Sequence, residues 1–250
     1  MPPLRLKCLA CEVLARSVYW GAAHSPHSVD ISLLRIGLHV TPNKLRETLQ
    51  AEIDAVDSDS YAAVVLAYGL CGKATAGLRA GKVPLVLPRA HDCIALFLGG
   101  RERHAREFDA CPGTYWYVQD FVERGDDDDL VLSIGAQTAG DSDQVYADYV
   151  AKYGKDNADY LMEAMAAWQA HYERAVYIDL GLGDGRAVAE RAKSDAERRD
   201  WRFEKMAGDL ALVRRLLAGE WEDDFLVVQP GQRVEMAGGE EIISVCQCGE

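Results

Sequence analysis

Short apolar runs alternate with longer stretches of helical periodicity along the chain. The apolar runs that predict strands cover residues 4–9, 31–40, 62–66, 83–87, 175–180 and 225–228, with an aromatic run at 115–117. Between them, Leu45, Leu49 and Ile53 repeat at the spacing of one helix face, and Pro42 stands where that helix begins. Alternating strands and helices predict an α/β class with a mainly parallel sheet flanked by helices.

Further helices are expected over residues 93–98, 101–108, 144–171, 186–199 and 203–217. The two halves of the chain share a rhythm of apolar strand, loop and amphipathic helix. That rhythm favours two Rossmann-like lobes, residues 1–115 and 116–250, with a cleft between them. No sequence repeat relates the halves, so a single α/β unit over residues 1–250 is the alternative.

The net charge of the chain argues against several classes of partner. The 250 residues carry a formal net charge of −13, and no basic stretch stands out. Nucleic acids and anionic membranes would require a basic face, so we expect neither as a partner. No apolar run reaches the roughly 20 residues that span a bilayer. We expect a cytoplasmic protein with a small molecule or another protein as its partner, and homo-oligomerisation stays open.

The chain has seven cysteines, an odd number that argues against a framework of disulfides alone. In a reducing cytoplasm, cysteines gathered at one place indicate metal binding or catalysis more often than cross-linking. Any single cysteine is equally well explained as a small buried hydrophobe.

Two neighbouring strands each end in residues capable of chemistry. Cys71 lies in the segment Tyr68–Gly72 after the first, and His91 and Cys93 lie in the segment Pro88–Cys93 after the second. Ligands of open α/β sheets bind at the carboxyl ends of the strands, so these loops should converge. Cys11 follows the first strand of the chain and is a candidate fourth member.

This set predicts a metal site. Zinc prefers cysteine and histidine ligands in tetrahedral sites, and a catalytic zinc keeps one position open. Cys71, His91 and Cys93 would supply three ligands and Cys11 a fourth. Thiolates favour zinc or another soft-ligand metal over magnesium and calcium. The alternative is that the cysteines pack and that His91 is hydrogen-bonded in its loop.

Three neighbours of this set are candidate catalytic residues, each with a structural alternative. Arg89 would bind a substrate carboxylate or phosphate, or form a salt bridge. Tyr68 would donate a hydrogen bond to a ligand, or pack. Asp92 would act in catalysis, or cap the helix that follows it.

A glycine-rich segment supplies a separate candidate. Gly181, Gly183 and Gly185 follow the strand at 175–180, where backbone amides can approach a phosphate. The third glycine of the G-x-G-x-x-G pattern is missing, so an ordinary turn is the alternative reading.

Several segments together resemble a prokaryotic family, the domain of unknown function 1638. They are Cys11–Leu14, Tyr68–Gly72, Pro88–Cys93, Pro112–Tyr115, Gly219–Trp221 and Phe225–Val228, so the resemblance extends over nearly the whole chain. Members of this family are often encoded beside corrinoid-dependent methyltransferase systems, which implies a role in one-carbon metabolism. His91-Asp92-Cys93 is also similar to the H-x-C part of the zinc site of methylcobamide:thiol methyltransferases, although the order of the third thiolate differs.

Two functions of different classes follow. The first is an enzyme, a zinc–thiolate protein acting in corrinoid-linked methyl transfer, with a small-molecule substrate or a corrinoid protein as its partner. The second is an accessory protein that binds a corrinoid, a haem or a metal without turnover, with His91 as an axial ligand. A phosphate-binding α/β enzyme centred on the segment 181–185 is a third.

Overall fold

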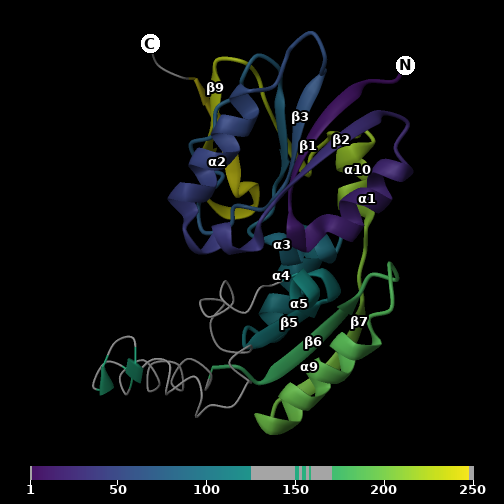
Figure 1. Cartoon of the computed structure of the whole chain (residues 1–250), viewed down its shortest axis with the longest axis vertical. Helices are drawn as coiled ribbons and strands as arrows, with labels where there is room; N and C mark the ends of the chain where they lie inside the picture. The colour runs from purple at the N-terminus through teal and green to yellow at the C-terminus, as the bar shows by residue number, and fades with distance from the viewer. Residues whose placement is uncertain (1, 125–149, 152–153, 156–157, 159–170, 248–250) are drawn as a thin grey trace. The chain divides into compact units, whose positions relative to one another are not determined.

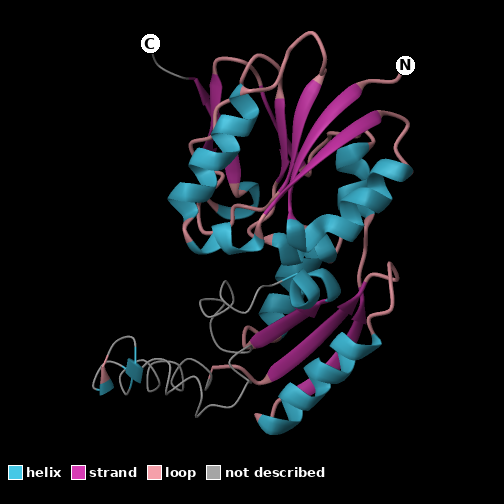
Figure 2. Ribbon diagram, in the orientation of Figure 1, coloured by secondary structure: helices cyan, strands magenta, loops and turns pink. Residues whose placement is uncertain are grey.

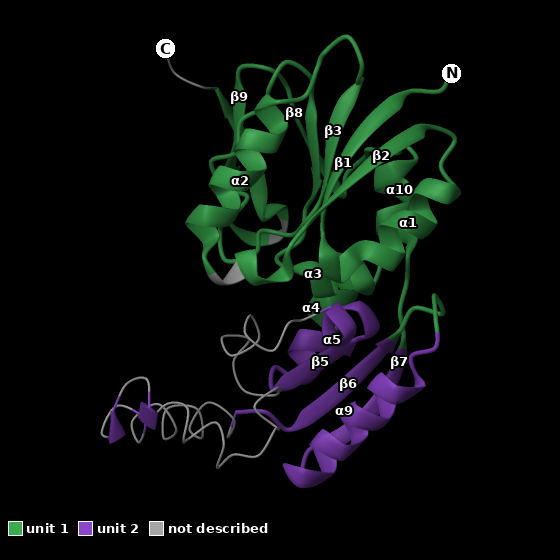
Figure 3. Ribbon diagram, in the orientation of Figure 1, with its two compact units in different colours: residues 1–106, 179–183, 207–250 green, residues 107–178, 184–206 purple. Residues whose placement is uncertain are grey.

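The computed structural model describes residues 2–124, 150–151, 154–155, 158 and 171–247. Most of the expected helical region 144–171 lies outside these residues. The chain forms two compact units (Figure 3): unit 1 comprises residues 1–106, 179–183 and 207–250, and unit 2 comprises residues 107–178 and 184–206.

A five-stranded sheet with the order β2-β1-β3-β4-β8 forms the centre of unit 1 (Figure 2). Its parallel strands are β1 (Arg5–Cys11), β2 (Ser28–Leu34), β3 (Ala63–Ala67) and β4 (Leu85–Pro88), and β8 (Phe225–Val228) is antiparallel to β4. Every residue of β3 and β4 is buried, as expected of central strands covered on both faces.

Helices cover both faces of this sheet. Helix α2 (Pro42–Asp54) packs on one face through Leu45, Leu49 and Ile53, while α1 (Ala15–Ala23) and α10 (Ala211–Leu217) pack side by side on the other (Figure 1). A Cβ at Gly21 of α1 would lie 2.8 Å from Leu217, so this glycine permits the close approach of the two helices.

Shorter elements complete unit 1. They are the 3-10 helices η1 (Glu12–Leu14), η2 (Ile36–Val40) and η3 (Gly239–Glu241), the helices α3 (Cys93–Phe97) and α4 (Arg101–Ala110, whose last residues belong to unit 2), and the antiparallel hairpin of β9 (Gln232–Met236) and β10 (Ile243–Gln247). Among the described residues, none of the helices has the length and apolar character needed to cross a bilayer.

Unit 2 is built on a three-stranded sheet, β5-β6-β7. Its strands are β5 (Thr114–Val118), β6 (Arg174–Asp179) and β7 (Arg202–Ala207), with the helices α5 (Gln119–Arg124) and α9 (Arg186–Arg198). β5 and β6 are parallel. β7 runs parallel to β6, since Arg202 N–H donates to Glu173 and Gly208 N–H donates to Asp179 at the same offset. Tyr117, Tyr177 and Trp201 form its aromatic core.

The mixed α/β class with mostly parallel pairing is confirmed, and two expected elements are wrong. The helix expected over 203–217 is strand β7 followed by α10, because residues 202–207 pair with β6. The strand expected over 31–40 ends at Leu34 and gives way to η2. The observed units also differ from consecutive lobes 1–115 and 116–250, because β8 returns to pair with β4.

Candidate functional site

The loops that follow β3 and β4 continue the pairing of the two strands. Leu70 N–H donates to the carbonyl of Ala90 at 2.8 Å, and Cys71 N–H donates to the carbonyl of His91 at 3.0 Å. A Cβ at Gly69 would lie 2.6 Å from backbone atoms of Asp92, so only glycine allows this contact. The two segments expected to converge are therefore joined by backbone hydrogen bonds.

Three cysteines lie at or after the carboxyl ends of β1, β3 and β4. Cys11 is the last residue of β1, and Cys93 is the first residue of α3. Cys71 has a left-handed backbone, with φ at +46°. A charge on Cys11 would raise the pKa of both other thiols, which places the three within one electrostatic environment. Three of the four expected metal ligands therefore influence one another electrostatically.

All three thiols are protonated at neutral pH. Burial raises the pKa of Cys11 to about 11 and that of Cys71 to about 12, and it raises the pKa of Cys93 well above the ordinary value. The charged groups that also shift these three pKa values are acidic side chains and the other thiols, with no lysine or arginine among them. A reactive cysteine normally has a positive neighbour that stabilises its thiolate, which this group lacks.

The Tyr68 side chain lies near Cys11 and Cys71. It is 2% exposed, and its hydroxyl forms no hydrogen bond with any described group. Cys11 is nonetheless close enough for this hydroxyl to lower the pKa of its thiol, as a donor to the thiolate would. The hydroxyl therefore faces a group that becomes a good acceptor only on losing its proton. A buried donor without an acceptor is uncommon in folded proteins and indicates a missing partner.

Asp92 caps helix α3, the structural alternative considered from the sequence. Its Oδ1 accepts hydrogen bonds from Ile94 N–H at 3.0 Å and Ala95 N–H at 3.3 Å. His104 Nε2 of α4 lies 3.6 Å from the same oxygen. His104 could not be found from the sequence, because its position on a charged helix carries no signal that α4 folds back to this loop.

His91 is exposed and contributes its backbone carbonyl to the loop pairing. Within the described part of the chain, no group of three or more His, Cys, Asp or Glu side chains has the arrangement of a metal site. Neither the four residues expected from the sequence nor the three thiols alone are therefore arranged as a metal site. The three thiols and the unpaired Tyr68 hydroxyl suit a soft cation by their donor chemistry, while the arrangement needed to bind one would require the side chains to shift.

Arg89 lies next to this site and is bonded to backbone atoms. Its Nη1 donates to the carbonyl of Glu241 at 3.1 Å and also to the carbonyl of Ile243. Its own N–H donates to Asp224 at 2.8 Å. Arg89 thus ties the segment before β10 to the end of β4, and a role in binding substrate stays a prediction.

The glycines at 181–185 serve turn geometry and packing. Gly181 has φ at +67°, and its N–H donates to Asp179 Oδ1. A Cβ at Gly185 would lie 1.6 Å from the Tyr177 hydroxyl, so this position requires glycine. Asp184 Oδ1 accepts the N–H of Arg186, the first residue of α9, and thereby occupies an amide that a phosphate would use. Phosphate binding by Gly181, Gly183 and Gly185 stays a prediction.

A family model described as "Protein of unknown function (DUF1638)" matches residues 33–217. The chain belongs to this family. Neither the curated proteins nor the solved structures that were searched include a match.

The DUF1638 match includes two of the three thiols, Cys71 and Cys93, as well as Tyr68. Cys11 and the strands β8 to β10 lie outside it, so the match is shorter than the nearly whole-chain resemblance seen in the sequence. The loops after β3 and β4 therefore form the part of the site that lies within the family region.

Proposed function

We propose that this DUF1638 protein is a metal–thiolate protein in which Cys11, Cys71 and Cys93 bind a soft metal ion, zinc in the first place. The observation that supports the proposal is the presence of one buried and two half-buried thiols at the ends of β1, β3 and β4, beside a buried tyrosine hydroxyl that has no hydrogen-bond partner among the described residues. Its action in corrinoid-linked methyl transfer in the cytoplasm rests on the family resemblance.

The charges around the thiols favour binding of a cation by the cysteines over the action of one cysteine as a nucleophile. No basic side chain contributes to the pKa values of Cys11, Cys71 and Cys93, so each thiol keeps its proton. A divalent cation would supply the missing positive charge and release those protons, since metal ligands must be deprotonated. Bound zinc would supply the activation of a substrate thiol as a nucleophile.

The neighbouring residues would hold the site in place. Tyr68 would donate its hydroxyl hydrogen to the Cys11 thiolate, which is the acceptor that the protonated thiol does not provide. Asp92 would fix Cys93 at the first turn of α3 through the cap. Gly69 would keep the two loops at the distance that brings Cys71 near Cys93.

The metal content of protein purified without a histidine tag tests this proposal. We expect near-stoichiometric zinc in the wild type and its loss in Cys11→Ser, Cys71→Ser and Cys93→Ser. Cys111→Ser is the matched control, because Cys111 is buried in unit 2, where its thiol bonds Glu173 at 3.3 Å. Wild-type protein that takes up no zinc even on titration after reduction would overturn the proposal.

The fourth ligand is tested separately with His91→Ala. Loss of zinc in this variant would show that His91 turns inward to complete the site. Retention of zinc would show that the three thiols suffice, with the fourth position left for a substrate thiol.

A second candidate is an accessory protein that holds a corrinoid or a haem without turnover. The exposure of His91 at the end of its loop favours this alternative, because an axial ligand must be accessible to a large cofactor. Cobalamin and haem are added in turn, and a shifted visible spectrum that disappears in His91→Ala is expected. An unchanged spectrum with both cofactors removes this candidate.

A further inference from the structure

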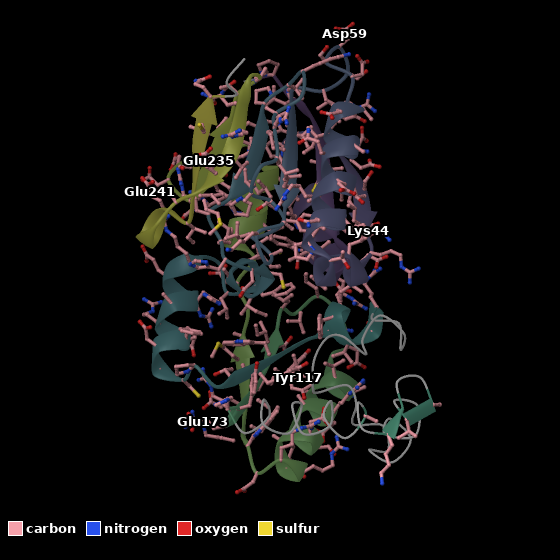
Figure 4. The ribbon with its side chains drawn as sticks, turned by 90° about the vertical axis from the view of Figure 1, so that its left-hand side faces the viewer. Lys44, Asp59, Tyr117, Glu173, Glu235 and Glu241 are labelled. Carbon is pink, nitrogen blue, oxygen red and sulfur yellow. The ribbon has the colours of Figure 1, made fainter. Side chains whose placement is uncertain are left out.

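A groove lined by three arginines lies in unit 1, apart from the residues of the thiol site. Its volume is about 540 Å³, and Arg46, Arg79 and Arg233 contribute to it from α2, from the segment before β4 and from β9. Glu235, labelled on the hairpin in Figure 4, is the one acidic residue among those that line it. Three positive charges and one negative charge give the groove a formal charge of +2 in a chain whose net charge is −13.

Two of these arginines stand directly opposite each other. Arg79 and Arg233 are partners in an antiparallel bridge, flanked by hydrogen bonds from Val234 N–H to Leu78 and from Ala80 N–H to Gln232. This pattern identifies a non-hydrogen-bonded pair, in which facing side chains lie on the same side and closest together. Like charges at such a pair destabilise a sheet unless another charge compensates them.

The positive charges of Arg79 and Arg233 are only partly compensated by ion pairs within the groove. Glu235 Oε1 accepts Arg233 Nη2 at 2.7 Å and Nε at 3.2 Å. The backbone of Arg79 is held by Gln50, which accepts its N–H at 2.9 Å and donates to its carbonyl at 3.2 Å. Within the described part of the chain, however, no hydrogen bond or ion pair reaches the Arg79 guanidinium. Glu47 and Asp54 line an adjoining pocket with Arg79, but among the described residues neither forms an ion pair with its guanidinium.

The third arginine is held in place by backbone acceptors. Arg46 donates from Nε to the carbonyl of Ala74 at 3.2 Å and from Nη2 to that of Lys73 at 2.7 Å. These contacts leave its Nη1 for another acceptor. They also fix the guanidinium before a ligand arrives, which lowers the entropy lost on binding.

We propose that this groove binds a small anion carrying two or more phosphate or carboxylate groups, held between Arg46, Arg79 and Arg233. Guanidinium groups match such oxyanions because they donate two parallel hydrogen bonds in one plane. The anion supplies the counter-charge that Arg79 lacks and relieves its repulsion with Arg233. The inference does not depend on metal binding by the cysteines.

Calorimetric titration of the purified full-length protein with pyrophosphate and with citrate tests the proposal. We expect saturable binding of at least one of these anions, weaker at high ionic strength. Binding of pyrophosphate alone assigns the groove to phosphates, and binding of citrate alone assigns it to carboxylates. Arg79→Gln is expected to weaken binding about ten-fold or more, as expected for the loss of charged hydrogen bonds.

Two further variants separate a site from a general charge effect. Glu235→Gln should strengthen binding, because it removes the carboxylate that competes for Arg233. Glu220→Gln is its matched control: it makes the same change of charge in unit 1, at the exposed pair with Arg214, and should leave affinity unchanged. Binding of neither anion, or equal affinities in Arg79→Gln and the wild type, would overturn the proposal.

Cys93→Ser distinguishes the anion groove from the thiol site. This variant should lose zinc and still bind the anion as the wild type does, so failure of the thiol proposal can be told from failure of the anion proposal. Arg79→Gln should also leave the melting temperature of the free protein unchanged or raise it, since it removes a repulsion. A marked loss of stability would instead show that Arg79 is a structural residue and would contradict the proposal.

Discussion

Replacing Tyr68 with phenylalanine should stabilise the metal-free protein, the opposite of the usual effect of a core substitution. The ring of Tyr68 stays buried in the variant, and the only atom lost is a hydroxyl oxygen that has no hydrogen-bond partner among the described residues. An unsatisfied buried polar group costs about 1–3 kcal/mol. We therefore expect the free energy of unfolding to rise by about 1–2 kcal/mol.

The assay is thermal and urea unfolding of reduced protein after removal of metal. For a chain of this size, 1 kcal/mol corresponds to roughly 2–4 °C, so the expected rise in melting temperature is about 2–8 °C. Tyr61→Phe is the matched control in the same unit. Its hydroxyl donates to Asp30 Oδ2 at 2.8 Å, so its removal should lower stability or leave it unchanged.

Zinc affinity should change in the opposite sense. Without the hydroxyl, the Cys11 thiolate loses a donor, and we expect zinc to bind about five- to ten-fold more weakly, which corresponds to about 1 kcal/mol. If Tyr68→Phe instead lowers the melting temperature of the metal-free protein, the hydroxyl already has a partner. The argument for a missing acceptor would then be refuted.

Three other predictions follow from the same site. In the metal-free protein, burial raises the pKa of Cys11 to about 11 and of Cys71 to about 12, so the unfolded state loses these protons first as the pH rises above about 9. The free energy of unfolding should be unaffected below pH 9 and should fall by about 1.4 kcal/mol per pH unit for each thiol from there towards pH 11. Urea unfolding at several pH values checks this, and a Cys11→Ala stability profile identical to that of the wild type would contradict it. Gly69→Ala should destabilise the protein by about 1–3 kcal/mol, since the added Cβ would meet the backbone of Asp92 at 2.6 Å; unchanged stability together with unchanged zinc content would show that the loops can separate freely. Asp92→Ala should lower stability by about 1 kcal/mol, while Asp92→Ser keeps a capping oxygen and should cost less; equal losses in both variants would show that the carboxylate charge matters more than the cap.

Sequence periodicity was sufficient where an element buries a regular apolar face. The strands β3 and β4 are short runs of apolar residues bounded by turns, and α2 shows its buried leucines at helical spacing. Sequence periodicity failed for residues 202–207, where the segment R-F-E-K-M-A fits a helix or an exposed strand equally well. Pairing with β6 decided in favour of the strand, and that contact is made with residues far away in the sequence.

Local patterns predicted the α/β class and the positions of Cys11, Cys71 and Cys93 at strand ends, and they offered the helix cap as one of two roles for Asp92. These predictions follow from local chemistry and from the rule that parallel strands end at the same edge of a sheet. Which of the candidates face one another depended on the folded chain. It placed His91 outward, tied Arg89 to backbone carbonyls, and brought Arg79 opposite Arg233 across a gap of more than a hundred residues. Side-chain direction and long-range pairing depend on how the whole sheet packs, which no local pattern of residues encodes.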